Sequence, residues 1–216
     1  LLQSSAASDV YKRQPLQVVF EEEAGLVPVT ITNPDNGHPF FELQAPTPLS
    51  LGAEINVEAV GQALSLSVSA IRSDRHRPQL ASVGLPFLMV ELKDREALEK
   101  ARPNLDAFPV LQAQGVAMTH LYVRSEDEFD LRTRMFAPLD GVTEDPATGS
   151  ANCALAGFLA HLEEGANREY DWRIAQGVEM GRPSELRARA RKQNGVVTTT
   201  WIGGNCIQVA EGTLHI

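Results

Sequence analysis

The stretch that most constrains the fold is Gly141–Leu162, which reads GVTEDPATGSANCALAGFLAHL. Apolar residues in its second half recur at the spacing that places side chains on one face of a helix. They are Ala151, Leu155, Phe158, Leu159 and Leu162. Asp145 precedes Pro146, which biases its backbone toward the extended region. We therefore predict a helix that begins near Thr148 after a non-helical approach.

The predicted helix start could also bind an anion. Thr148 or Ser150 can cap the first turn, and Gly149 lets another group approach the backbone closely. The first N–H groups of a helix lack intrahelical partners and carry partial positive charge, so they bind carboxylates or phosphates. Asp145 lies just upstream as an acid. The residues alone leave open an ordinary capped helix that faces water, which is the commoner case.

Composition excludes several classes of function. The formal net charge is −9, from 19 basic and 28 acidic residues, so we do not expect a nucleic-acid partner. No apolar run reaches the roughly 20 residues that span a bilayer, so no membrane partner is expected. The histidines show no metal-ligand spacing, and the glycine-rich phosphate motifs are absent. We expect acid–base chemistry with no metal and no cofactor.

Two cysteines, Cys153 and Cys206, provide no disulfide framework. One falls in the predicted helix and the other in a strand-rich tail. Buried free thiols in a reducing cytoplasm are the simplest interpretation, so we predict a cytoplasmic protein.

Short alternating segments predict an α+β fold with many strands and few helices. Asn194–Gly195 is the strongest turn signal and predicts a hairpin, and Gly203–Gly204 predicts a further turn. Asn56 and Asp94 are predicted helix caps. The expected strands include Leu16–Phe20, Leu26–Thr32, Phe40–Leu43, Val116–Val123, Leu131–Phe136, Glu185–Arg191, Val196–Ile202 and Cys206–Val209, with a last strand after Glu211–Gly212.

Several basic side chains have a structural interpretation that we prefer to a functional one. Arg187, Arg189 and Arg191 alternate along one strand; they could bind an anion, but a solvated strand face is favoured because no aromatic residue lies among them. His120 lies on the apolar face of a predicted strand, where a structural role is favoured. His161 lies in the last helical turn, where a cation suits the helix dipole.

The segment EDPATGSA, at Glu144–Ala151, resembles the signature of the PhzF-like family, named for a phenazine-biosynthesis isomerase. Three other segments agree in order and spacing: SVGLPFLMVEL at Ser82–Leu92, RMFAPLDG at Arg134–Gly141 and QGVEMGRPSEL at Gln176–Leu186. With FEEEAGLVPV at Phe20–Val29, the resemblance runs from about Leu16 to the end. It implies the two-lobed diaminopimelate-epimerase fold.

The resemblance also implies a function. PhzF-like enzymes are cofactor-free isomerases that move a proton on a small carboxylate in a cleft between two lobes, as in trans-2,3-dihydro-3-hydroxyanthranilate isomerisation. Asp145 matches the acid that contacts the substrate and assists proton transfer. Gly149 and Ser150 match positions that hold the substrate carboxylate, and we group Thr148 with them as substrate-binding. The family further suggests a homodimer.

This chain departs from the family pattern in one respect. The family's main proton carrier, a first-lobe glutamate, and a later Gly-His pair have no match here, and Glu144 is not a substitute because its side chain diverges from that of Asp145. We expect residues 1–14 to be a foreign leader and 15–78 the remainder of an incomplete first lobe with a linker. Residues 79–216 would form the second lobe, whose last strands could return to the first. On this interpretation the chain alone is inactive.

Two alternatives remain open. A non-catalytic binding or interaction protein could keep the same fold. A two-thiol amino-acid epimerase is less favoured, because that enzyme type has a cysteine where this chain has Asp145–Ala147, and Cys153 lies inside the helix.

Overall fold

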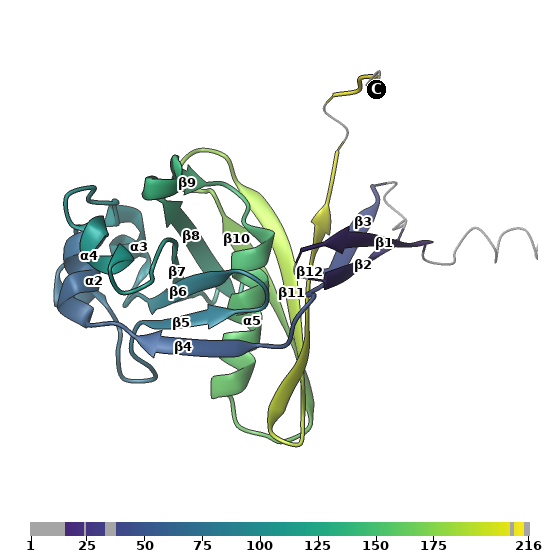
Figure 1. Ribbon diagram of the computed structural model, residues 1–216, viewed down its shortest axis with the longest axis horizontal. Coiled ribbons are helices and arrows are strands. Elements are labelled where there is room, and N and C mark those ends of the chain that lie inside the picture. The colour runs from purple at the N-terminus through teal and green to yellow at the C-terminus, as the bar shows by residue number, and fades with distance from the viewer. Residues whose placement is uncertain (1–15, 24, 33–37, 208–209, 214–216) are drawn as a thin grey trace, which may run out of the picture.

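The computed structural model describes residues 16–23, 25–32, 38–207 and 210–213, and its strands form one mixed sheet (Figure 1). Most neighbours are antiparallel; β6 with β7 and β8 with β10 are parallel. The α+β prediction is confirmed. In spatial order the strands are β1 (Leu16–Glu22), β2 (Gly25–Thr32), β3 (Phe40–Gln44), β12 (Val196–Asn205), β11 (Ser184–Gln193), β10 (Arg168–Gln176), β8 (Leu131–Ala137), β7 (Thr119–Arg124), β6 (Pro86–Glu91), β5 (Gln79–Ser82) and β4 (Ser50–Glu54), with β9 (Val142–Asp145) beside β8.

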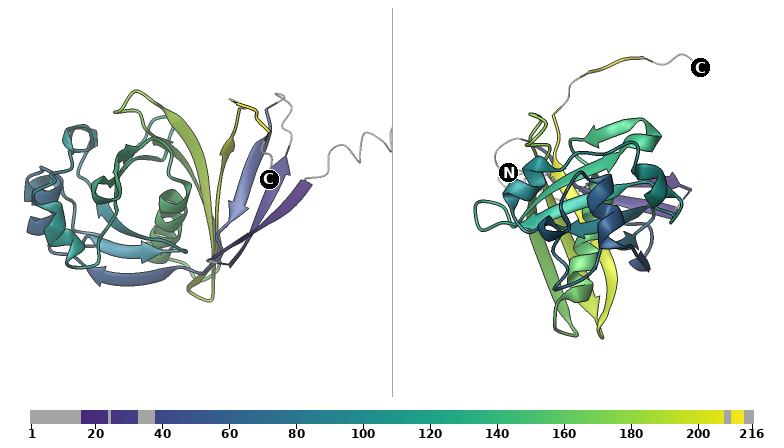
Figure 2. Two further views of the ribbon diagram at one scale, coloured as in Figure 1. Left: turned by 45° about the horizontal axis from the view of Figure 1, so that its top comes forward. Right: turned by 90° about the vertical axis from the view of Figure 1, so that its left-hand side faces the viewer.

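The central helix α5 (Gly149–Leu162) lies inside the curl of the sheet (Figure 2). It packs against β5, β6, β10, β11 and β12. The predicted helix is confirmed. Every residue from Ala151 to Ala160 is buried, so burial extends beyond the apolar face that the spacing predicted. Strands surround the helix, and its small residues let them approach: a Cβ on Gly157 would lie 3.1 Å from Thr200 Cγ2.

A second core lies on the other face of the central strands. Successive residues of β6 point to opposite sides, so Phe87 and Met89 pack with α5 while Leu88 and Val90 pack in the second core. The helices of that second core are α2 (Val57–Ala63), α3 (Arg95–Lys100) and α4 (Phe108–Gln112), and the short 3₁₀ turns are η1 (Val68–Ala70) and η2 (Pro138–Asp140).

The predicted helix caps are confirmed. Asn56 Oδ1 accepts the Ala59 N–H at 3.0 Å, and Asp94 Oδ1 accepts the Ala97 N–H at 2.9 Å. At the far end of α5 the cation that meets the last carbonyls is buried Lys192, on β11. Its Nζ donates to His161 O at 3.2 Å and to Glu163 O at 2.7 Å. His161 itself contributes a carbonyl there.

The Asn194–Gly195 hairpin is confirmed, because β11 and β12 pair up to Gln193 opposite Val196, and both turn residues have positive φ. The turn predicted at Gly203–Gly204 was wrong. Both glycines continue β12 and pair with β3. A Cβ on Gly203 would lie 2.7 Å from Phe41 O and 2.6 Å from the Phe40 ring, so glycine here permits close strand approach.

The tail differs from its prediction where it is described. Cys206 and Ile207 are not in a strand. Cys206 is exposed, so the prediction of two buried thiols was wrong for Cys206 and is confirmed for Cys153. Residues 208–209 and 214–216 lie outside the described residues, as do the loop at 33–37 and the predicted leader at 1–14.

The arginine strip of β11 is neutralised by acidic neighbours, which supports the structural interpretation. Arg187 pairs with Asp171 at 2.7 Å, Arg189 with Glu42 at 2.6 Å and Arg191 with Glu169 at 2.6 Å.

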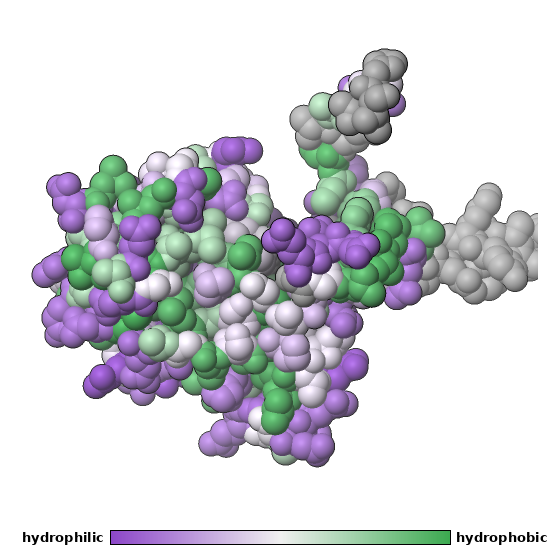
Figure 3. Space-filling view, in the orientation of Figure 1, coloured by the Kyte–Doolittle hydropathy of each residue, from purple (hydrophilic) through white to green (hydrophobic). Residues whose placement is uncertain are grey.

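The β1–β2 end of the sheet carries exposed apolar side chains (Figure 3). Leu16, Val19, Phe20 and Leu26 are all more than half exposed, at 62%, 56%, 53% and 64%. None of the helices in the described ranges has the length and hydropathy of a membrane span.

Candidate active site

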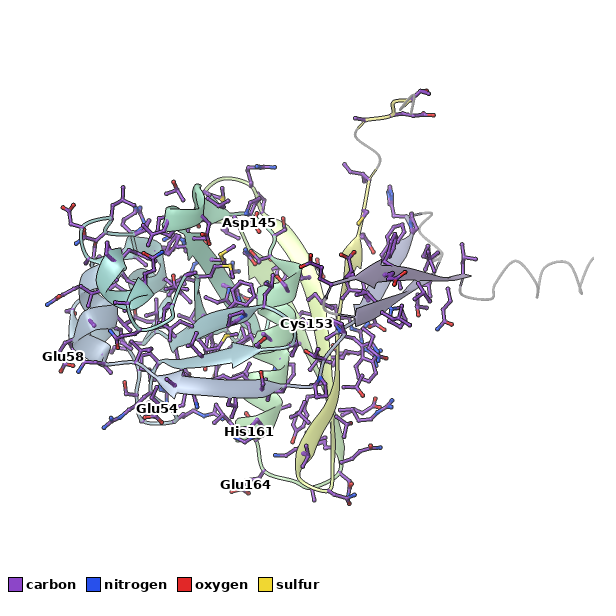
Figure 4. The ribbon with its side chains drawn as sticks, in the orientation of Figure 1. Glu54, Glu58, Asp145, Cys153, His161 and Glu164 are labelled. Atoms are coloured by element: carbon purple, nitrogen blue, oxygen red, sulfur yellow. The ribbon has the colours of Figure 1, made fainter. Side chains whose placement is uncertain are left out.

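The candidate site lies where β9 ends and α5 begins (Figure 4). Thr148 is the residue before the helix, and its hydroxyl does not cap the first turn. It donates instead to Asp145 Oδ2 at 2.6 Å. The structure therefore brings Asp145 and Thr148 into direct contact, with the carboxylate partly exposed.

The amides of the first turn remain available. The first helical bond runs from Asn152 N to Thr148 O at 3.1 Å. Within the described residues, the Gly149 and Ser150 N–H groups donate to no other part of the chain. Ser150 is exposed, and no side chain caps the first turn of α5. The helix start thus offers adjacent N–H donors near Asp145, as an anion site requires.

A groove with a volume of about 980 Å³ opens beside this helix start. Ala147 and Gly149 contribute to its lining, whereas Asp145, Thr148 and Ser150 do not. Apolar residues from β3 and the end of β12 form one side, namely Phe40, Phe41, Leu43 and Ile202. Arg173 and Arg187 also line the groove, together with the carboxylates that they pair with, Glu185 and Asp171. The groove suits a small molecule with an apolar or aromatic body.

Gln176, at the end of β10, is fully buried beneath the site. Its Nε2 donates to Asp145 O at 2.7 Å and to Thr148 Oγ1 at 2.9 Å. Its Oε1 accepts the Thr148 N–H at 3.1 Å and Asn152 Nδ2 at 2.6 Å. One side chain therefore joins the last residue of β9 to the first turn of α5.

The polar network continues into the core through Asn152. Because Asn152 Nδ2 donates to Gln176 and to Thr148 O, its Oδ1 must accept from His120 Nε2, at 3.1 Å. Full burial lowers the His120 pKa to about 4, so the imidazole is neutral near pH 7. Its Nδ1 has no partner among the described atoms. The structural role favoured for His120 is thus supported.

Glu144 points away from this centre. Its carboxylate forms two 2.8 Å bonds to the guanidinium of buried Arg134, which also donates to carbonyls of Leu98 and Ala101. This ion pair engages both carboxylate oxygens, which supports the prediction that Glu144 does not substitute for the proton carrier.

The thiol of Cys153 is also not placed to transfer a proton to a substrate. It is buried within α5, and its sulfur donates to Thr200 Oγ1 at 3.4 Å. Burial raises the Cys153 pKa to about 11, which keeps the group protonated and weakly nucleophilic. The arrangement argues against a two-thiol mechanism at this helix.

The sequence predicts the helix start and its acid, but it does not predict that Gln176, Asn152 and His120 belong to one network. One signal was available for Asn152, an amide side chain within an otherwise apolar helical run. Gln176 lies in the quoted QGVEMGRP segment, yet its partners are 24 to 43 residues away, beyond any local pattern.

The chain is similar to known isomerases over most of its length. The chain is 33% identical over 207 residues to an uncharacterized isomerase of Mesorhizobium japonicum, covering 92% of this chain and 68% of that protein. It is 32% identical over 205 residues to trans-2,3-dihydro-3-hydroxyanthranilate isomerase of Pseudomonas aeruginosa, covering 93% and 68%.

A solved phenazine biosynthesis protein of Bacillus anthracis, from the PhzF family, has the same fold. Its TM-score is 0.76 at 23% identity, covering 87% of this chain and 64% of that one. The chain therefore spans about two thirds of the length of these proteins. A predicted epimerase of Pseudomonas aeruginosa shares the fold, with a TM-score of 0.69 at 25% identity, covering 94% of this chain and 69% of that one. The predicted diaminopimelate-epimerase-like fold is confirmed.

The family match runs over residues 4–212, so it begins before Leu16, inside the segment predicted as a leader. Residues 1–15 lie outside the described part of the chain, and the predicted domain boundaries stay predictions. With nearly the whole sequence matched, this chain belongs to the family of phenazine biosynthesis-like proteins, PhzC-PhzF.

Proposed function

We propose that this chain carries part of the active site of an isomerase that moves a proton on a small carboxylate substrate without a metal or other cofactor. The observation that carries the proposal is that two N–H groups without a partner in the described chain, those of Gly149 and Ser150, begin the helix near Asp145. The Asp145 carboxylate accepts the Thr148 hydroxyl at 2.6 Å. Helix N–H groups would bind the substrate carboxylate, and Asp145 would assist proton transfer.

The groove beside Gly149 indicates the kind of substrate. Its rings and aliphatic side chains favour a cyclic body, as in the dihydrohydroxyanthranilate that the Pseudomonas aeruginosa relative is named for. The main proton carrier of such an enzyme has no match in this chain, so the chain alone is proposed to be inactive. Homodimer formation and a cytoplasmic location, the latter suggested by two unpaired cysteines, complete the proposal.

The test is solvent-deuterium exchange into cyclic and amino-acid carboxylates, followed by NMR. It compares this chain with a chimera that adds the part of the Mesorhizobium japonicum isomerase outside the alignment. We expect exchange by the chimera, undiminished by a metal chelator, and none by the chain alone. Equal exchange by both would place the proton carrier within this chain. A folded chimera that binds carboxylates without exchange would favour the non-catalytic alternative.

A further inference from the structure

Gln176 bridges the two sides of Pro146. The segment between β9 and α5 contains Pro146, which has no N–H to donate. Asp145 O and the Thr148 N–H flank this proline, and both bond to the Gln176 amide, at 2.7 and 3.1 Å. The side chain thereby fixes the spacing between the acid and the helix start.

The same amide also sets the direction of the Thr148 hydroxyl. Gln176 Nε2 donates to Thr148 Oγ1 at 2.9 Å, which occupies a lone pair of that oxygen. The single hydroxyl hydrogen then points to Asp145 Oδ2 at 2.6 Å. Both Nε2 donors are used in these bonds, and Oε1 accepts the Thr148 N–H and Asn152 Nδ2 at 2.6 Å, with the Thr133 hydroxyl at a longer 3.5 Å. The buried amide therefore has one orientation.

We infer that Gln176 is a positioning residue, which aims Asp145 through Thr148 and holds it in register with the Gly149 and Ser150 amides. This inference rests on the proposed function, because it concerns the same carboxylate site. The residue does not line the groove and touches no reacting atom. Its loss would leave the groove in place but release the acid and the first helical turn from their common support.

The experiment titrates the 216-residue chain with benzoate and follows the Gly149 and Ser150 amide signals by NMR. In Gln176→Met, which has similar size but no amide, we expect benzoate to bind at least about tenfold more weakly and Thr148 amide exchange to accelerate. The matched control is Lys192→Met, which removes two bonds from the other end of α5. It should lower the melting temperature while leaving benzoate affinity unchanged.

Gln176→Glu separates positioning from general stability and serves if the methionine variant does not fold. The new carboxylate can still accept the Thr148 N–H but cannot donate, so the Thr148 hydroxyl would turn toward it and away from Asp145. We expect retained Thr148 amide protection and benzoate affinity within a few-fold of wild type, together with a loss of deuterium exchange when Gln176→Glu is placed in the active chimera. A Gln176→Met affinity within twofold of wild type, a loss that Lys192→Met reproduces at equal melting temperature, or undiminished exchange by the Gln176→Glu chimera would overturn the inference.

Failure of the proposed function gives a different result. If benzoate leaves the wild-type Gly149 and Ser150 signals unmoved, the anion site itself is wrong. Thr148 amide exchange then decides the role of Gln176 alone. Faster exchange in Gln176→Met than in Lys192→Met supports it, and equal exchange contradicts it.

Discussion

Replacing Asp145 with asparagine is expected to lower deuterium exchange by the active chimera by about 10²- to 10⁴-fold, the usual contribution of a positioned acid–base group. Asparagine has nearly the same size and can still accept the Thr148 hydroxyl, which lies at 2.6 Å in the wild type. It cannot take up and return a proton. Benzoate affinity should therefore stay within a few-fold of wild type while turnover collapses.

Asp140→Asn is the matched control for this experiment, because Asp140 is an exposed acid on the same approach to α5. It should leave the exchange rate unchanged. An Asp145→Asn chimera that folds and exchanges at the wild-type rate would remove Asp145 from the mechanism. The proton carriers would then have to be sought among the acids that line the groove, Asp171 and Glu185.

Replacing Gly177 with alanine is expected to destabilise the protein by about 2–5 kcal/mol. Gly177 has a φ of +77°, a left-handed conformation that costs other residues about 1–2 kcal/mol. A Cβ there would also lie 2.3 Å from Arg182 O and 2.7 Å from Pro146 O, and such overpacking adds about 1–3 kcal/mol. Because Pro146 follows Asp145, relief of the clash should also displace the candidate site.

Gly181→Ala provides the control within the same loop. Its φ is +74°, but a Cβ there would meet no atom within 4 Å, so only the conformational cost applies. Urea unfolding should show a clearly larger loss of stability for Gly177→Ala than for Gly181→Ala. Equal losses would mean that close packing of Gly177 on Pro146 is unimportant.

Local chemistry made part of the site predictable. Pro146 after Asp145, followed by Thr148 and Gly149, identifies a helix start whatever surrounds it, and α5 begins there. The Asn194–Gly195 hairpin is similarly local, since both residues tolerate the positive φ that the turn requires.

The errors arise where distant segments decide the outcome. Periodicity detects apolar residues on α5 but not the strands that enclose it, so all-round burial was missed. The Gly203–Gly204 pair is typical of a turn, yet it continues a strand because β3 approaches Gly203 closely. The groove depends on the same pairing of β3 with β12, and the local sequence of neither strand predicts that pairing.

The most direct test of the central claim is a crystal structure of this chain with benzoate. We predict a carboxylate oxygen within about 3.2 Å of the Gly149 and Ser150 backbone nitrogens, with the ring in the groove beside Phe40 and Phe41. Benzoate bound elsewhere, with those amides bonded to another part of the chain, would contradict the assignment of this helix start as a carboxylate site.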